Sequence, residues 1–227
     1  MAGPYWRSSA EDEAMQDEHG FLWLAMLEMV GTDLSGYKVL DAGCNRGGFL
    51  RLLADQAGIA KGFGYDPAPG AIDDARHLSE SYPLSFEVAA TVPEGWSGFD
   101  VAFSHEVLYL LFDLPSHASA LFAALVPGGS YFASMGVHAD SPLMTAWHAD
   151  HAKDLDLPGP YRLEEVVEVF KEAGFDVGVG RLPVRFVPVD AHRVDSGPDS
   201  RLGDVLDYYC RDKVMFRFQR PHEDRTG

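Results

Sequence analysis

The sequence predicts a single, doubly wound α/β domain built on a mostly parallel, seven-stranded sheet. Three observations predict it: short apolar segments alternate with helical ones, a glycine-rich turn follows the first strand-like segment, and the chain of 227 residues suits one domain. Strands that alternate with helices form parallel sheets that are covered on both faces. We therefore expect one hydrophobic core.

Residues 1–35 are expected to form a helical cap on this domain. Ser9 is a typical helix-capping residue, and the acidic run 11–13 suits the first helical turn. Apolar residues then recur up to Gly31, so we expect the helix to end near Val30. This segment is expected to act as a lid.

The alternation of strands and helices begins at Tyr37 and continues through most of the chain. Strands are expected at 37–41, 61–65, 85–89, 99–103 and 131–135, and helices at 48–54, 71–78, 114–125 and 163–173. Residues 175–189 and 213–220 alternate well enough to form a closing antiparallel pair at the edge of the sheet.

Two connections are much longer than the usual four to six or so residues. They are 137–161 and 188–209. Long insertions in compact domains tend to be lids or binding loops, so we expect 137–161 to cover a substrate.

Composition excludes several classes of function. The hydrophobic fraction of 46% and charged fraction of 23% suit a soluble globular protein, and the formal charge of −17 disfavours nucleic acids and anionic membranes as partners. Cys44 and Cys210 are too few for a disulfide framework, and residues 1–7 do not resemble a secretory signal. A cytoplasmic location is expected.

The segment 39–49, VLDAGCNRGGF, carries the main functional signal. A strand that leads into a glycine-rich turn lets a ligand approach the backbone, and the amide groups of the next helix face that ligand. Asp66 ends the second strand, 19 residues after Gly47, where a carboxylate can accept hydrogen bonds from ribose hydroxyls. A NAD-binding turn would tolerate the same residues. These features therefore predict an adenosine cofactor but do not distinguish NAD from other adenosine cofactors.

This segment resembles the first motif of the class I S-adenosylmethionine-dependent methyltransferases, an acid followed by Gly-x-Gly-x-Gly. Asp41, Gly43 and Gly47 match the pattern, whereas Asn45 replaces the middle glycine; asparagine tolerates left-handed backbone angles. Segments 98–108 and 125–131 resemble the family's fourth strand and the approach to its fifth. The resemblance is firm from about residue 37 to 136 and implies a Rossmann-like methyltransferase fold with S-adenosylmethionine as cofactor.

By this resemblance, one group of residues is expected to bind the cofactor. Asp41 would hold the turn and the cationic amino end, and Ser104 and His105 would lie near the methionine part. No acid stands at Ala90, where family members often bind adenine, so backbone groups or another side chain must read that base. The full expected set is Asp41, Gly43, Cys44, Asn45, Gly47, Asp66, Pro67, Ala90, Ser104 and His105. Cys44 is expected to contribute only its backbone.

Catalytic candidates are sought after the fourth and fifth strands, because ligands of doubly wound sheets bind beyond the carboxyl ends of the strands. His138 is the first choice for a base, since imidazole titrates near neutral pH, and His105 and Tyr109 are further candidates. Tyr109 is expected to face the methyl group. The aromatic side chains expected to bind substrate, with Tyr109 and His138, are Tyr5, Trp6 and Trp147.

The sequence therefore predicts transfer of a methyl group to an oxygen or nitrogen atom of a small molecule. No metal is expected, since His148 and His151 lack an assured third ligand. Trp23 is interpreted as a packing residue of the N-terminal helix. A non-catalytic cofactor-binding or partner subunit and an NAD-dependent oxidoreductase stay open as alternatives, and a homodimer is possible.

Overall fold

A computed structural model describes residues 9–188 and 201–222 and contains a single seven-stranded sheet. The strand order is β3-β2-β1-β4-β5-β7-β6. The strands are β1 (Lys38–Ala42), β2 (Lys61–Asp66), β3 (Leu84–Val88), β4 (Phe99–His105), β5 (Leu125–Met135), β6 (Asp176–Arg181) and β7 (Val214–Gln219). Neighbouring strands from β3 to β5 are parallel, and β7 runs antiparallel to both β5 and β6.

Helices connect these strands and cover the sheet. They are α1 (Ser9–Val30), α2 (Gly48–Ala57), α3 (Pro69–Leu78), α4 (Leu114–Ala124), α5 (Pro142–Leu155), α6 (Leu163–Glu172) and α8 (Leu202–Asp207), with short helical turns η1 (Leu108–Leu110) and η2 (Tyr208–Asp212). Capping residues help to set where these helices begin. The Asp113 side chain, for example, caps α4 by accepting a hydrogen bond from the amide of Ser116 at 3.0 Å. The predicted mostly parallel, doubly wound domain is confirmed.

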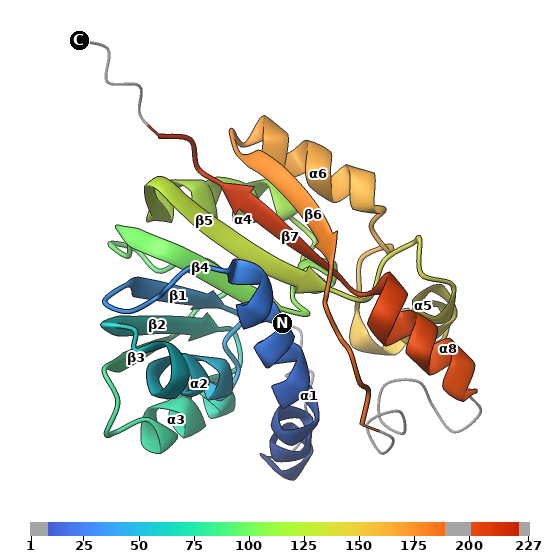
Figure 1. Ribbon diagram of the computed structural model, residues 1–227, viewed down its shortest axis with the longest axis horizontal. Coiled ribbons are helices and arrows are strands. Elements are labelled where there is room, and N and C mark those ends of the chain that lie inside the picture. The colour runs from blue at the N-terminus through green and yellow to red at the C-terminus, as the bar shows by residue number, and fades with distance from the viewer. Residues whose placement is uncertain (1–8, 189–200, 223–227) are drawn as a thin grey trace.

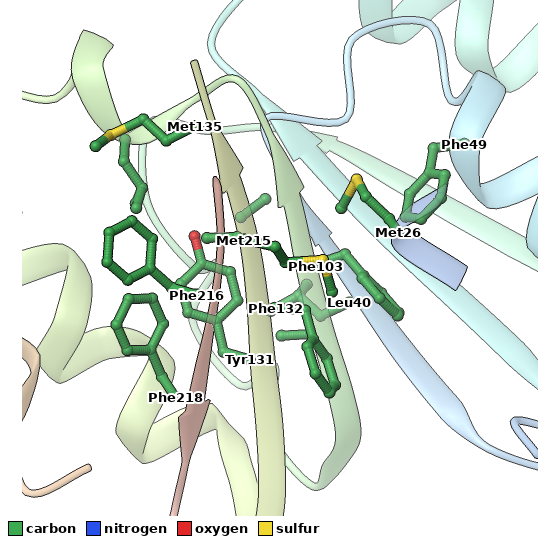
Figure 2. Close-up of a cluster of buried hydrophobic side chains, with 14 of the residues drawn as sticks. Met26, Leu40, Phe49, Phe103, Tyr131, Phe132, Met135, Met215, Phe216 and Phe218 are labelled. Carbon is green, nitrogen blue, oxygen red and sulfur yellow. The ribbon is translucent and has the colours of Figure 1, made fainter. Parts of the chain in front are cut away.

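The core has two layers, one on each face of the sheet. On one face Phe49 of α2 packs edge-on against Phe103 of β4, and Met26 of α1 is fully buried beside them (Figure 2). On the other face Phe170 of α6 stacks on Phe218 of β7 with ring centroids 3.6 Å apart. Aromatic side chains from helices and strands thus pack on both faces of the sheet.

Those carboxyl ends meet at one edge of the sheet. Figure 1 shows that β1, β4 and β5 point towards α1, and that α5 and α8 lie beyond the end of β5. Ligands of open parallel sheets bind at this edge. The arrangement therefore places α1, α5 and α8 around any bound ligand.

One expectation about these connections and strands needs revision. The strand predicted at 175–189 ends at Arg181, because Pro183 and Pro188 lack the amide hydrogen that a sheet ladder needs. The connection 137–161 contains the helix α5, and 188–209 contains α8. Tyr5, Trp6 and the stretch 189–200 lie outside the described residues.

Within residues 9–188 and 201–222, the helices are too short or too polar to cross a membrane.

Candidate functional site

The glycine-rich turn joins β1 to α2 and has the backbone shape that its sequence predicts. Gly43 has φ +76° and Gly47 φ +72°, and Asn45 adopts φ +48° in the left-handed region. A Cβ on Gly43 would lie 2.5 Å from the Val107 side chain, and one on Gly47 would lie 2.7 Å from the Phe86 ring. The turn therefore depends on glycine for its conformation and for space.

Asp66 ties the end of β2 to this turn. Its carboxylate accepts a hydrogen bond from the amide of Asn45 at 3.1 Å and another from the amide of Ala68 at 2.9 Å. Burial raises the pKa of Asp66, and these two hydrogen bonds oppose that rise. Each carboxylate oxygen keeps a lone pair for a further donor such as a ribose hydroxyl.

Asp41 lies under the same turn and is 3% exposed. Burial, and second the negative charge of Asp66, raises the pKa of Asp41 to about 8. A buried carboxyl group with this pKa is ready to bind a cation, because a positive charge restores its ionised form. Cys44 is also buried, and burial followed by the charges of Asp41 and Asp66 raises its pKa well above the ordinary value, so its thiol is a poor nucleophile.

Three neighbouring positions complete this half of the site. Arg46 is buried and pairs with Asp74 of α3 at 3.1 Å. Pro67 and Ala90 are exposed just beyond β2 and β3. The amide of Ala89 donates to the carbonyl of Asp66 at 3.0 Å, which brings the ends of these two strands together.

The side chain of Ser104 does not face this edge. It is fully buried, and its hydroxyl lies 2.6 Å from the Tyr131 hydroxyl, which in turn lies 3.1 Å from the Nε2 atom of His117 on α4. The expected contact between Ser104 and the methionine part of a cofactor is therefore restricted to backbone atoms.

His105 lies at the end of β4 beneath the helix α1. Its Nδ1 atom is 2.7 Å from the Ser134 hydroxyl, and its Nε2 atom is 3.1 Å from the Nδ1 atom of His19. The Trp23 ring also contacts His105, with centroids 6.4 Å apart. Burial, then the neighbouring His19 and Lys213, holds the pKa of His105 well below its ordinary value, so the ring stays neutral at neutral pH.

A buried ion pair links the ends of β4 and β5 to the start of β7. The Lys213 ammonium, 1% exposed, donates to Glu106 at 2.8 Å and to the Tyr208 hydroxyl at 3.0 Å. Glu106 has φ +58° and also accepts from the amide of Gly136 at 3.0 Å. Neither Lys213 nor Tyr208 was predicted as a site residue, because no local motif surrounds them.

His138 follows β5 and is 2% exposed. Its Nε2 atom lies 2.8 Å from the carbonyl oxygen of Asp212, and a carbonyl only accepts, so Nε2 carries the proton. The basic lone pair of the neutral ring is then on Nδ1, which is buried and has no hydrogen-bond partner among the described residues. Ser141 donates to the Asp212 carboxylate at 3.0 Å and so fixes the carbonyl that orients His138.

The insertion 137–161 is anchored at its base. The amide of Ala139 donates to the carbonyl of Tyr161 at 2.9 Å, and the Tyr161 hydroxyl donates to the carbonyl of Leu111 at 2.7 Å. Trp147 of α5 is half-buried and stacks on His151, and Tyr109 is buried in η1. In the part of the chain that the structure describes, no three His, Cys, Asp or Glu side chains cluster closely enough to hold a metal ion.

These features define a class of protein. A glycine-rich turn after β1, an acid at the end of β2 and an antiparallel β7 form the Rossmann-like arrangement that is typical of domains that bind an adenosine cofactor. Residues 12–178 match the family model described as "Methyltransferase domain". Because the match covers most of the chain, the protein belongs to this family, which confirms the resemblance identified in the sequence.

Relatives and solved structures agree with this assignment. The chain is 35% identical over 105 residues to the ubiquinone biosynthesis O-methyltransferase of Methylocella silvestris, covering 44% of this chain and 40% of that protein. It is 29% identical over 135 residues to the malonyl-[acyl-carrier protein] O-methyltransferase of Serratia marcescens, covering 59% and 51%. The chain thus spans about half the length of these curated relatives.

The fold matches a methyltransferase solved in complex with the Haloferax volcanii Trm112 activator. The TM-score is 0.78 at 22% identity, and the match covers 94% of this chain and 95% of that chain. At this identity the match supports the fold alone.

Proposed function

We propose that the protein transfers the methyl group of S-adenosylmethionine to an oxygen or nitrogen atom of a small molecule. The observation that carries the proposal is the pairing of Asp41 and Asp66 around the Gly43–Gly47 turn. Asp66 has lone pairs for the ribose hydroxyls, and the cationic amino end of the cofactor would stabilise the ionised form of the buried Asp41. The residues of the turn therefore fit this cofactor.

The remaining cofactor contacts follow from position. The backbone of Gly43, Cys44, Asn45 and Gly47 would line the cofactor, although the amides of Gly43 and Cys44 already donate to the Tyr65 carbonyl and the amide of Asn45 donates to Asp66. Pro67 and Ala90, exposed beyond β2 and β3, would flank the adenosine. The bound cofactor supplies an electrophilic methyl group on a sulfonium. The protein must then orient the acceptor in line with the methyl–sulfur bond and remove a proton where the acceptor carries one.

His138 is the residue we assign to proton removal. Its proton is held on Nε2 by the Asp212 carbonyl, so Nδ1 is the basic atom, and this atom has no partner among the described residues. A hydroxyl or amine on the acceptor would supply the missing hydrogen bond and pass its proton to Nδ1. His105 is the weaker candidate, because both of its ring nitrogens already have partners and its pKa is depressed.

The relatives favour an oxygen acceptor. Both curated relatives described above are named as O-methyltransferases. Tyr109 and Trp147, buried and half-buried at the same edge, offer aromatic surface for an apolar acceptor, and Tyr5 and Trp6 remain candidates outside the described residues. An apolar phenol, alcohol or carboxylic acid is the proposed acceptor class.

The test is a transfer assay with methyl-labelled cofactor and a panel of phenols, alcohols, carboxylic acids and amines. His138→Gln should lower the rate about 10²- to 10⁴-fold for acceptors that arrive protonated, the usual contribution of a positioned base. The rate of transfer to acidic phenols that are already ionised should fall much less. Equal loss for both kinds of acceptor would remove His138 from proton transfer, and no transfer to any compound would favour a non-catalytic subunit.

A protein partner remains a second possibility, because the structural neighbour from Haloferax volcanii was solved with an activator. Cofactor binding by the purified chain alone, followed by size-exclusion chromatography, distinguishes an independent enzyme from one that needs a partner or forms a homodimer. A NAD-dependent oxidoreductase, the other alternative, would bind NAD in place of S-adenosylhomocysteine.

A further inference from the structure

Trp23 has an unexplained hydrogen-bond donor at the functional edge. The side chain is 8% exposed, and its Nε1 atom is buried without a hydrogen-bond partner among the described residues. A buried N–H group without a partner costs about 1 to 3 kcal/mol, so such groups call for an explanation. A residue that only packed helix α1 onto the sheet would serve equally well as phenylalanine.

The position of Trp23 limits what the donor could meet. Its ring contacts Phe49 in the first turn of α2, with centroids 5.8 Å apart, and His105 at the end of β4, with centroids 6.4 Å apart. His19 lies four residues earlier on the same face of α1 and also contacts His105. The α1 face that carries His19 and Trp23 therefore covers the gap between the glycine-rich turn and β4.

The first turn of α2 offers further donors at the same place. Gly47 caps this ten-residue helix without a side-chain hydrogen bond, and the first turn contains no acid. The positive end of the helix dipole and its amide groups are therefore suited to an anion. The indole N–H of Trp23 is the second, independent feature that calls for a negatively charged oxygen here.

The cofactor has one anionic group, the carboxylate of its methionine part. The Asp66 carboxylate would repel it, Asp41 is assigned to the ammonium group, and Arg46 already pairs with Asp74. Lys213 is already engaged by Glu106 and Tyr208. Among the described residues, Trp23 Nε1 is a buried donor without a partner, and the first turn of α2 beside it has no side-chain cap.

We propose that Trp23 is a cofactor-binding residue whose indole N–H donates a hydrogen bond to the carboxylate of S-adenosylmethionine beside the first turn of α2. This inference rests on the proposed function. It gives α1 a direct role in the site, because this helix would contact the amino-acid end of the cofactor. It also replaces the interpretation of Trp23 as a packing residue only.

The test compares two ligands and two matched variants by calorimetry. S-adenosylhomocysteine carries the carboxylate, and 5′-methylthioadenosine lacks the whole amino-acid part. Trp23→Phe keeps an aromatic ring and removes the N–H, so it should weaken S-adenosylhomocysteine about ten- to a hundredfold, the range for a hydrogen bond to a charged group, and leave methylthioadenosine unchanged. Trp96→Phe, which makes the same change in a ring packed on Phe63 and Phe99, should alter neither affinity.

The outcomes separate this inference from the proposed function. Equal affinity changes for both ligands, or no change for either, would overturn the carboxylate contact while methyl transfer could still stand. A raised KM for the acceptor with unchanged S-adenosylhomocysteine binding would overturn it too. If the unaltered protein bound neither ligand, the proposed function would fail, and the inference with it.

A second measurement on the unaltered protein does not depend on how the variant folds. In ¹⁵N-labelled protein, the Trp23 indole N–H resonance should shift and its hydrogen exchange should slow with S-adenosylhomocysteine but not with methylthioadenosine. Trp96→Phe and the other single Trp→Phe variants assign the resonance. The same response to both ligands would overturn the proposal.

Discussion

The two halves of the candidate site are built in different ways. The cofactor half, around the ends of β1 and β2, consists of a glycine turn and two acids within residues 41–66. The acceptor half lies around the ends of β4 and β5. It brings together Lys213 and Glu106, which are 107 residues apart in the sequence, and His19 and His105, which are 86 residues apart. Local backbone geometry thus shapes one half, and long-range packing assembles the other.

This difference has an energetic consequence. Substitutions in the cofactor half should disturb binding more than folding, because its key residues shape a turn at the surface of the sheet. Substitutions in the acceptor half should disturb folding as well, because its charged groups are buried in contact with each other. Substitutions at Gly43, Lys213, Asp66 and Asp41 test that contrast.

Gly43→Val should abolish cofactor binding, with an affinity loss of at least a hundredfold or so. The new side chain would meet Val107, and φ +76° is strained for any residue with a Cβ. Calorimetry with S-adenosylhomocysteine measures the loss, and circular dichroism checks the fold. Gly70→Ala is the control, because a Cβ there meets no atom within 4 Å. Binding that survives in Gly43→Val would show that the cofactor lies elsewhere.

Lys213→Met should lower the free energy of unfolding by about 3 to 5 kcal/mol, because it leaves the Glu106 carboxylate buried without its cation. Urea denaturation measures this loss. Adding Glu106→Gln to Lys213→Met removes the uncompensated charge and should restore part of the stability. If the double variant is no more stable than Lys213→Met, charge compensation is not what holds this half together.

Asp66→Ala should weaken cofactor binding by about 1 to 3 kcal/mol, the cost of leaving hydroxyl groups without their charged partner. Asp73→Ala on the neighbouring α3 removes an exposed carboxylate and serves as the control. Titration calorimetry that finds both variants equal to the unaltered protein would remove Asp66 from the site.

Asp41 should make cofactor binding depend on pH. Below its raised pKa of about 8, Asp41 holds a proton in the ligand-free protein, and the cofactor's ammonium group favours the ionised form. Binding near neutral pH should therefore release up to about one proton, and affinity should increase as the pH rises towards 8. Calorimetry in buffers of different ionisation heat counts the protons. Release that persists in Asp41→Asn would assign it to another group.

The same shift affects stability in a defined direction. The pKa of Asp41 is higher in the folded state than the ordinary aspartate value of 3.8, so the folded state binds the proton more tightly. Its contribution to the free energy of unfolding therefore falls as the pH rises from about 4 to about 8. Asp41→Asn should flatten this part of the stability profile.

The sequence predicted the fold and the backbone shape of the glycine turn well because both depend on short-range patterns. The alternation of strands and helices gave the sheet, and Asn45 has the left-handed angle that its place in the turn required. Sequence did not predict the contacts of Ser104, whose side chain faces the core, because one strand register decides which face it takes. Nor could it place Lys213 and His19, since no local pattern records a partner that lies so far along the chain.

A crystal structure of the protein with S-adenosylhomocysteine tests the account most directly. We expect the ribose hydroxyls to bind Asp66, the amino group to approach Asp41, and the carboxylate to lie between Trp23 and the first turn of α2. The sulfur should then face the half of the site that contains His138 and Tyr109. A cofactor bound away from the Gly43–Gly47 turn, or with its sulfur turned away from His138, would contradict it.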